Sequence, residues 1–247
     1  MGKVYFIGAG PGDPELITVK GRRIIESAAA VLYAGSLVPR EIADFAPQGA
    51  VVRDSSNMSL EETHAFIIKH VENGDVARVH TGDPSLYGAM PEQMRLLDEA
   101  GMEYEVVPGV TAAFAAAAAA GASFTLPEVC QSLVLTRLPG RTPMPEAERL
   151  REMARTGASL AVYLSGAKAS DLAEELMAAG LHEDRPVLCA HRVGWPEQRL
   201  IWSSVGDLAR AAAENGLENQ TVFMILPQGR GARSRLYDPD FSHGCRE

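Results

Sequence analysis

The sequence contains little cysteine, which excludes two common ways of stabilising a small fold. Its 247 residues include Cys130, Cys189 and Cys245, an odd number in which no two form a C-x-x-C pair. Such a set does not build a disulfide framework and lacks the ligand spacing of a structural zinc site. We therefore expect no metal site and a fold that depends on its hydrophobic core.

The sequence also lacks an excess of positive charge. Its formal net charge is −9, and 46% of its residues are apolar while 22% are charged, as in ordinary globular proteins. Phosphate backbones are bound by positive fields, so we expect no nucleic-acid partner. An acidic protein can still bind a polyanionic small molecule through a local cluster of Arg and Lys.

Long membrane-type apolar runs are missing as well. The apolar start, Met1–Ile7, is too short for a signal peptide and leads directly into a glycine-rich loop. The longest unbroken stretch, Val110–Leu126, is mostly alanine with Gly121 inside it. Alanine contributes little to membrane insertion, so this stretch predicts a tightly packed helix. We expect no membrane association and a cytoplasmic protein.

What the sequence does contain is an alternation of short β-branched runs and helical stretches. This pattern is typical of a mostly parallel sheet covered by helices, and it occurs twice along the chain. We predict an α/β fold with one domain over residues 1–112 and a second, similar one over 113–247. The predicted strands are 3–7, 30–33, 51–53, 76–80, 104–107, 132–136, 160–165, 187–193, 198–203 and 221–226, with 187–193 and 198–203 as a pair. The predicted helices are 14–27, 60–71, 91–100, 110–126, 145–155, 169–179 and 205–214.

A glycine-rich loop, Gly8–Pro14, joins the first predicted strand to the first helix, with Asp13 as N-cap. It resembles a dinucleotide-binding fingerprint but departs from it in detail. Asp13 stands where a third glycine is needed, Pro11 interrupts the loop, and Val31–Gly35 has no acidic residue to bind a ribose. The loop therefore indicates either another ligand or a plain strand-to-helix connection.

Two further glycine-bearing loops follow strands in the same half. In Thr81–Gly88, Gly82 allows close approach of a ligand and Asp83 offers an acceptor, although Asp83-Pro84 could equally cap the next helix. In Pro108–Ala113 the glycine precedes the alanine-rich stretch, which could serve packing alone. Three such loops in one half are more than packing needs.

Together these segments resemble the tetrapyrrole (uroporphyrinogen and precorrin) methylases. Residues 4–21 are similar to the opening signature of that family, and 81–84 and 108–112 are similar to its other two characteristic stretches. The resemblance follows the whole chain in order and spacing. Within the family, residues 32–38 and 236–243 look most like the branch that methylates C-11 of precorrin-4 or of its cobalt form.

The resemblance implies two α/β domains with S-adenosylmethionine in the cleft between them, S-adenosylhomocysteine as product, and a homodimer. Its implied cofactor-binding residues, matched position by position, are Pro11, Gly82, Asp83, Leu86, Thr111, Ala112, Leu164 and Ala190. Leu164 stands where many members have methionine. Ala190 belongs to the stretch 189–193, which also departs from the commonest spelling.

A tetrapyrrole substrate carries acetate and propionate groups, which suit charge-assisted pairing with arginine. Arg53 and Arg137 each follow or end a predicted strand and are the candidates, with His80 as a possible helper; the alternative is exposed charge at a strand end. The sequence identifies no catalytic base. Methylation of uroporphyrinogen or of another precorrin position stays open, as does a non-catalytic protein that binds a tetrapyrrole or S-adenosylmethionine. Diphthine synthesis matches the loops less well, and ribosomal RNA methylation conflicts with the acidic charge.

Overall fold

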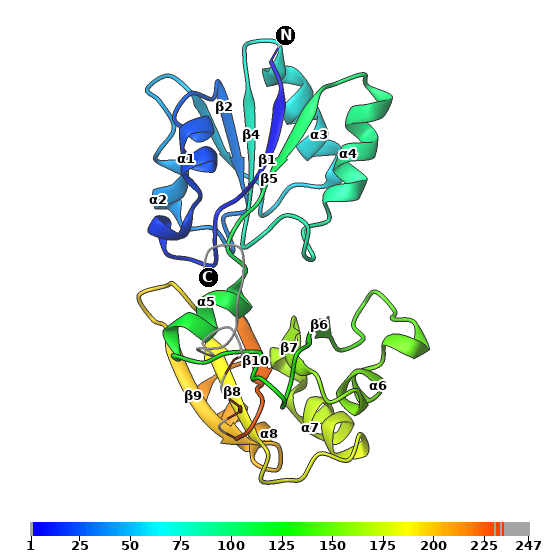
Figure 1. Cartoon of the computed structure of the whole chain (residues 1–247). Coiled ribbons are helices and arrows are strands. Elements are labelled where there is room, and N and C mark those ends of the chain that lie inside the picture. The colour runs from blue at the N-terminus through cyan, green and yellow to red at the C-terminus, as the bar shows by residue number, and fades with distance from the viewer. Residues whose placement is uncertain (1, 230, 233, 235–247) are drawn as a thin grey trace, which may run out of the picture. The chain divides into compact units, whose positions relative to one another are not determined.

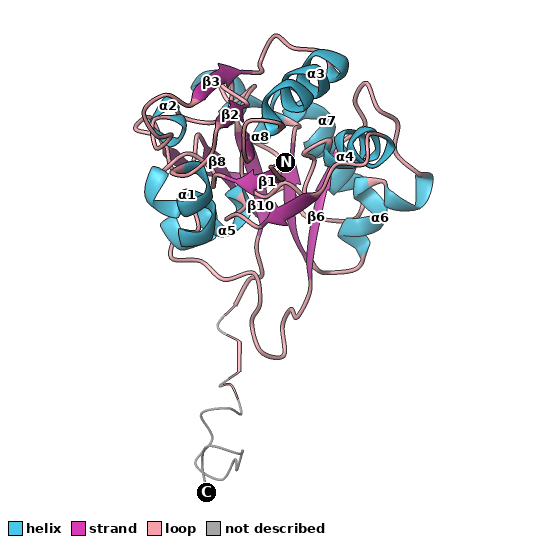
Figure 2. Cartoon of the chain, turned by 90° about the horizontal axis from the view of Figure 1, so that it is seen from above, coloured by secondary structure: helices cyan, strands magenta, loops and turns pink. Residues whose placement is uncertain are grey.

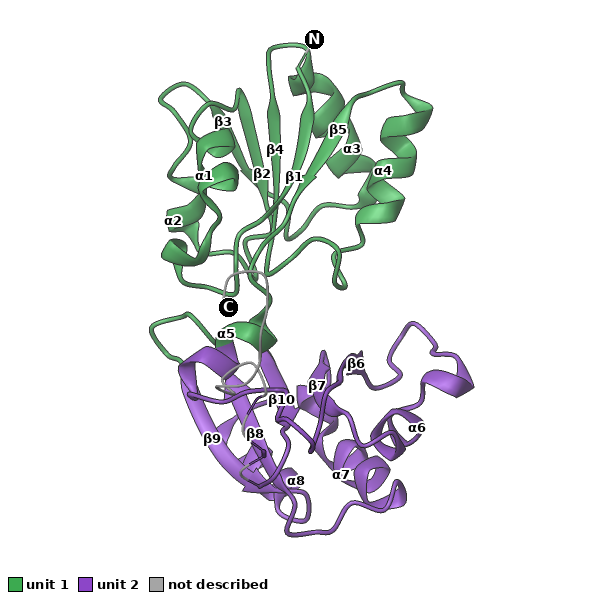
Figure 3. Cartoon of the chain, viewed as in Figure 1, with its two compact units in different colours: residues 1–115, 192–198 green, residues 116–191, 199–247 purple. Residues whose placement is uncertain are grey.

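The computed structural model describes residues 2–229, 231, 232 and 234, and they divide into two compact units. The first unit comprises residues 1–115 together with 192–198, and the second comprises 116–191 and 199–247 (Figure 3). The first unit thus ends three residues later than the predicted domain 1–112, and it includes residues 192–198, which the sequence analysis placed in the domain 113–247. The tail motif 236–243 lies outside the described residues.

The first unit contains a five-stranded sheet in the order β3-β2-β4-β1-β5 with every pair parallel. Its strands are β1 (Val4–Gly8), β2 (Ala30–Tyr33), β3 (Val51–Asp54), β4 (Val76–His80) and β5 (Tyr104–Val107). Its helices are α1 (Val19–Ile25), α2 (Arg40–Ala43), α3 (Leu60–Val71) and α4 (Met90–Glu99). All five strands were predicted, whereas the one-turn helix α2 was not.

Helices cover both faces of this sheet, as Figures 1 and 2 show. On one face Ile25 of α1 and Ile42 of α2 pack with Ile7 and Val79. On the other face the core of α3 and α4 includes Leu97 and lies against alternate strand residues such as Phe6. Residues of the central strands β1, β2 and β4 alternate between these two apolar layers and are buried on both faces, whereas the edge strand β3 is largely exposed.

Two local helix predictions had different outcomes. Helix α3 matches its predicted bounds because a capping box fixes its start: Ser59 accepts from the Glu62 amide while Glu62 bonds back to Ser59. The single helix predicted over 14–27 is wrong. A 3-10 turn, Pro14–Leu16, is capped by Asp13 as expected, but Thr18 is extended and starts α1 by accepting from the Gly21 amide.

The second unit has a sheet in the order β6-β7-β10-β8-β9, and here the predicted mostly parallel arrangement is wrong. Only β6 (Leu133–Arg137) and β7 (Ser159–Tyr163) pair in parallel. The strands β8 (Pro186–His191), β9 (Arg199–Ser204) and β10 (Thr221–Ile225) make antiparallel pairs. A short connection forces β8 and β9 into the predicted hairpin, because parallel neighbours need a longer crossover.

Three helices pack on the second sheet: α6 (Leu150–Arg155), α7 (Ala169–Ala178) and α8 (Leu208–Asn215). Their core includes Leu172, Leu208 and Phe223, all fully buried. Short 3-10 turns, Glu146–Glu148 and Gly166–Lys168, precede α6 and α7. The alanine-rich stretch forms α5 (Ala112–Ala119), shorter than predicted, and the division between the units falls within it. Within the described residues no helix has both the length and the apolar character needed to cross a membrane.

Candidate functional site

The three predicted glycine loops lie at one edge of the first sheet. Because β1, β4 and β5 are adjacent and parallel, the loops that follow Gly8, His80 and Val107 all leave at the carboxyl edge. After β1 the chain leads to α1 on one face, and after β4 it leads to α4 on the other. Divergence of this kind marks a topological switch point, where open α/β sheets bind their ligands.

At this edge the loops meet backbone to backbone, which requires glycine. A Cβ atom on Gly109 would lie 2.1 Å from the Gly82 carbonyl oxygen and 2.7 Å from the Gly8 Cα atom. A Cβ atom on Gly8 would lie 2.6 Å from the same Gly82 oxygen. Real Cβ atoms do not approach backbone this closely, so neither position tolerates a side chain without displacement. The ends of β1, β4 and β5 are therefore locked to one another.

A pair of backbone hydrogen bonds joins the first two loops. The Gly82 amide donates to the Gly10 carbonyl at 2.8 Å, and the Gly10 amide donates to the Gly82 carbonyl at 3.3 Å. Gly10 and Gly82 have φ values of +80° and +60°, a region that disfavours other residues. A Cβ atom on Gly82 would have no atom nearer than 3.9 Å. A side-chain carbon there would make only ordinary van der Waals contact, with the Thr111 Cα atom, so the positive φ and not crowding is what favours glycine at position 82.

Asp83 braces the second loop against the third. Its carboxylate accepts from the Gly109 amide at 2.9 Å and, through the other oxygen, from the Ser85 amide at 2.8 Å. Helix α4 begins only after Ala89, which occupies its N-cap position. The alternative that Asp83 caps this helix is therefore wrong, and its observed role is to fix the relative position of two loops.

The remaining predicted residues of this unit lie around the same loops. Leu86 is half-buried and donates its amide to the Asp83 carbonyl at 3.1 Å. Thr111 and Ala112 are half-buried where α5 begins. Pro11 is buried, and its carbonyl accepts a hydrogen bond from the indole of Trp195 at 3.0 Å. Trp195 could not be found from the sequence, because nothing local links it to a loop 184 residues earlier.

The resemblance to the C-11 branch rests partly on residues 32–38, which comprise the end of β2 and the turn after it. Within them the Gly35 amide donates to the Asp54 carboxylate at 3.0 Å, and a Cβ atom on Gly35 would lie 2.2 Å from that carboxylate. The Ser56 amide also donates to Asp54, and these bonds lower the pKa of its carboxyl group, Ser56 contributing most. This segment therefore has a defined fold at the carboxyl edge.

Two predicted cofactor residues belong to the second unit and differ in character. Leu164, directly after β7, has a φ of +51° and is 70% exposed. A leucine in this left-handed region is strained, and strain of this kind gathers at functional sites. Ala190 lies within β8, fully buried, and pairs with Val222 and Leu200.

The two predicted arginines have different surroundings. Arg53 is exposed on β3, an edge strand of the first sheet. Arg137 ends β6 in the second unit, and its guanidinium donates to the carbonyl groups of Leu138, Thr142 and Pro143. Arg53 thus extends a cation to solvent, whereas Arg137 organises the loop that follows its own strand.

His80 lies in a buried polar cluster that the sequence did not reveal. Its side chain is 5% exposed, and Nε2 has no hydrogen-bond partner among the described residues. Burial, helped by the charge of Arg78, lowers the pKa of the imidazole to about 3. Burial also lowers the pKa of Arg78 to about 10, and its guanidinium donates to Gln93 and Ser55. His80 is therefore neutral at physiological pH, the wrong form for an ion pair with a carboxylate.

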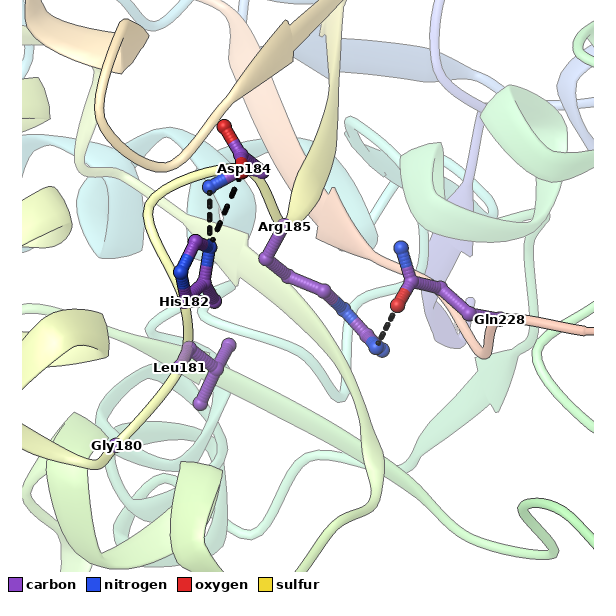
Figure 4. Close-up of a pocket in the computed structure, with 6 residues that line it drawn as sticks. All are labelled: Gly180, Leu181, His182, Asp184, Arg185 and Gln228. Atoms are coloured by element: carbon purple, nitrogen blue, oxygen red, sulfur yellow. Dashed lines mark hydrogen bonds and ion pairs between the residues drawn. The ribbon is translucent and has the colours of Figure 1, made fainter.

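A pocket of about 430 Å³ in the second unit contains none of the predicted site residues. It is lined by Gly180, Leu181, His182, Asp184, Arg185 and Gln228 (Figure 4). The Arg185 guanidinium donates to the Gln228 side chain at 2.8 Å and to the Leu226 carbonyl at 2.7 Å. His182 and Asp184 are exposed and contact each other at 3.3 Å. The Nε atom of Arg185 is buried and has no hydrogen-bond partner among the described residues. In the described part of the chain, no three His, Cys, Asp or Glu side chains gather as metal ligands would.

Comparison with known proteins agrees with this arrangement. The family model of the tetrapyrrole (corrin/porphyrin) methylases matches residues 3–209. The chain is 46% identical to the precorrin-4 C(11)-methyltransferase of Pseudomonas aeruginosa over 97% of both chains. It superposes with a TM-score of 0.87 on a cobalt precorrin-4 methyltransferase, at 43% identity over 90% of this chain and 93% of the other.

A further solved structure bears on the cofactor. The uroporphyrin-III C-methyltransferase of Thermus thermophilus, complexed with S-adenosylhomocysteine, superposes with a TM-score of 0.75. It is 26% identical and covers 91% of this chain and 92% of its own. The same fold is thus shared with methyltransferases that act on two different tetrapyrroles. The protein described here belongs to the tetrapyrrole (corrin/porphyrin) methylases.

Proposed function

We propose that the protein transfers a methyl group from S-adenosylmethionine to C-11 of precorrin-4, or of its cobalt form, giving the corresponding precorrin-5 in corrin ring synthesis. The observation that carries this proposal is the 46% identity to a precorrin-4 C(11)-methyltransferase over nearly the full length of both chains. The fold adds support through the TM-score of 0.87 to a cobalt precorrin-4 methyltransferase. Both substrate forms thus stay within the proposal.

The cofactor site of the proposal is the carboxyl edge of the first sheet. Gly82, with a φ of +60°, carries no side chain at the point where two loops join, and such a position suits a ligand that approaches backbone closely. Strand ends locked by Gly8 and Gly109 provide a rigid floor. We assign cofactor contacts on this unit to Pro11, Gly82, Asp83, Leu86, Thr111 and Ala112.

Leu164 is the strongest candidate on the second unit. A large apolar side chain that is 70% exposed and stands on a strained backbone gains little from folding alone. It would gain from burial against an apolar ligand surface such as the adenine ring. Ala190 is assigned by position only, and its burial within β8 restricts it to a backbone or close-packing contact.

When bound, S-adenosylmethionine supplies a methyl group that is already activated by its sulfonium charge. The work left to the protein is to align donor and acceptor for in-line transfer and to exclude water. Loops whose positions are fixed by glycine packing and by Asp83 are suited to alignment. Both Asp83 oxygens accept backbone N–H groups, so we assign it the role of holding the loops and not that of a base.

For the tetrapyrrole carboxylates we retain Arg53 and Arg137 as candidate binding residues. Arg53 is exposed on the edge strand β3, whereas Arg137 would have to exchange its carbonyl partners for a substrate carboxylate. Arg53→Ala and Arg137→Ala should weaken tetrapyrrole binding and leave S-adenosylhomocysteine binding intact. Equal substrate affinity in both variants would remove them from the site.

The test of the proposal is a methyl-transfer assay. Precorrin-4 is generated in a reconstituted upstream enzyme mixture, the protein is added with isotopically labelled S-adenosylmethionine, and the new methyl group is located by mass spectrometry and carbon NMR. One label at C-11 is the expected result. A label at another carbon would keep the reaction class and overturn the position, and absence of label with intact substrate would overturn the reaction.

Two alternatives are separated by the same experiment. The likeness to uroporphyrin-III C-methyltransferase keeps that substrate as a second candidate, to be offered in parallel. A non-catalytic binding protein would take up S-adenosylhomocysteine or a tetrapyrrole stoichiometrically without turnover. We further propose a homodimer in the cytoplasm, which sedimentation and cell fractionation would test.

A further inference from the structure

The loop between β8 and β9, residues 192–198, packs with the first unit although both strands belong to the second. Its tip, Gly194-Trp195-Pro196, faces the glycine-rich loop that follows β1. The proposed function uses Pro11 of that loop and assigns nothing to residues 192–198. The contacts between these two segments are close and specific.

Trp195 holds the glycine-rich loop through its indole N–H group, which donates to the Pro11 carbonyl at 3.0 Å. The ring lies so near the next residue that a Cβ atom on Gly12 would be 2.4 Å from its Cδ1 atom. On the other side a Cβ atom on Gly194, whose φ is +81°, would be 2.6 Å from the Asp13 amide nitrogen. Two glycines thus allow the segments to interlock, and the indole supplies the polar contact.

The indole is itself held in place from within its own loop. The Arg192 guanidinium stacks over the ring at 4.9 Å and contacts the Glu197 carboxylate at 3.4 Å. The Trp195 amide donates to the Arg192 carbonyl at 3.0 Å, and the Gly194 amide donates to the Gln198 side chain at 2.8 Å. Arg192 also has a φ of +48°, a strained value that the loop maintains. The donor is therefore positioned before any ligand arrives.

We propose that Trp195 is a positioning residue for the cofactor: it fixes the Pro11 carbonyl and so keeps the glycine-rich loop in its cofactor-receiving conformation. The inference rests on the proposed function, which places the cofactor at this loop. Pro11 is buried, so without the indole its carbonyl would lose its partner in a place that water reaches poorly. The loop would then adopt other conformations in part of the molecules. The apparent affinity for the cofactor would fall in proportion to the fraction that keeps the receiving conformation.

The first experiment compares Trp195→Phe with Trp202→Phe. The chain has two tryptophans, and Trp202 lies on β9, 57% exposed. Phenylalanine keeps a ring against Gly12 but removes the N–H donor. With S-adenosylhomocysteine as the probe in calorimetry, Trp195→Phe should raise the dissociation constant roughly threefold to tenfold, the effect of one neutral hydrogen bond. Trp202→Phe should bind like the unmodified protein.

Kinetics separate positioning from general damage. In the methyl-transfer assay Trp195→Phe should raise the KM for S-adenosylmethionine by the same factor and leave kcat within about twofold, because the hydrogen bond orders the loop before binding and not during transfer. A fall in kcat with an unchanged KM would overturn the proposal.

A second measurement follows Trp195 itself, in a variant that leaves this residue unaltered. In Trp202→Phe the only tryptophan left is Trp195, so its emission reports on the glycine-rich loop. S-adenosylhomocysteine should change that emission with the dissociation constant found by calorimetry. In Trp195→Phe, where Trp202 remains, emission should not respond. If the ligand binds while Trp195 emission stays constant and Trp195→Phe binds normally, the inference fails and the proposed function stands; absence of binding to the unmodified protein overturns both.

Discussion

Replacing Gly109 by alanine tests whether close backbone packing builds the site. The added methyl group would lie 2.1 Å from the Gly82 oxygen and 2.7 Å from the Gly8 Cα atom, and neither backbone can move alone. Overpacking of this kind costs about 1–3 kcal/mol, and contact with backbone on two sides puts this case near 3 kcal/mol. The displacement would also lengthen the bond from the Gly109 amide to Asp83.

Urea denaturation gives the free energy of unfolding, and calorimetry gives the affinity for S-adenosylhomocysteine. Gly140→Ala is the matched control, because a Cβ atom there would have its nearest neighbour, the Arg137 Nη1 atom, at 4.0 Å. We expect Gly109→Ala to lose both stability and affinity and the control to lose neither. Loss of stability with full affinity would remove the loops from the cofactor site, and full stability would refute the packing argument.

Three other changes test single features of the site. Asp83→Asn presents an amide to the Gly109 N–H group, so the free energy of unfolding should fall by about 1–3 kcal/mol and the affinity for the ligand should fall with it. An unchanged urea midpoint would contradict the role of Asp83 in holding the two loops. Leu164→Gly relieves the φ of +51° and should raise stability by up to about 1 kcal/mol while weakening S-adenosylhomocysteine binding; loss of stability would show that the leucine serves the fold. His80 has a pKa of about 3 in the folded protein against 6.5 for a free imidazole, so the unfolded chain binds more protons at this residue. Between pH 7 and pH 5 the free energy of unfolding should therefore fall by about 2 kcal/mol. Urea denaturation at both pH values measures this loss, which His80→Gln should not show.

The first unit could be predicted from sequence because its strands are short and bounded by turns, and because the central strands β1, β2 and β4 are buried along nearly their whole length. Such strands read as short apolar runs, and all five were found. The second sheet was misread for a related reason: apolar runs show that a strand is buried but not which way it runs. The break between Leu16 and Val19 was also missed, since Thr18 as a new N-cap breaks no helical periodicity.

Some residues of the candidate site could likewise be predicted from the sequence pattern, and others could not. Gly8, Gly82 and Gly109 were visible because glycine at a strand end marks either a close approach of backbone or a positive φ. Leu164 and Arg192 adopt left-handed backbone without glycine, so no residue type announces them. His80 and Arg78 are buried on β4, where Arg78 bonds to Gln93 of α4. This tertiary contact is not visible in the sequence, so His80 was predicted as a substrate ligand although it is a neutral interior group.

The contacts of the glycine-rich loop explain why it departs from the dinucleotide fingerprint. In that fingerprint the helix starts within the loop and its amides receive the pyrophosphate. Here Pro11 removes one amide, Gly10 pairs its own with Gly82, and the Pro11 carbonyl is taken by Trp195. The loop therefore has few donors left for a phosphate, and helix α1 starts late, after Thr18. A ligand with a sulfonium in place of a pyrophosphate agrees with this loss of donors. Pro11 and Asp13, which break the fingerprint within the loop, also lie where the loop interlocks with residues 192–198.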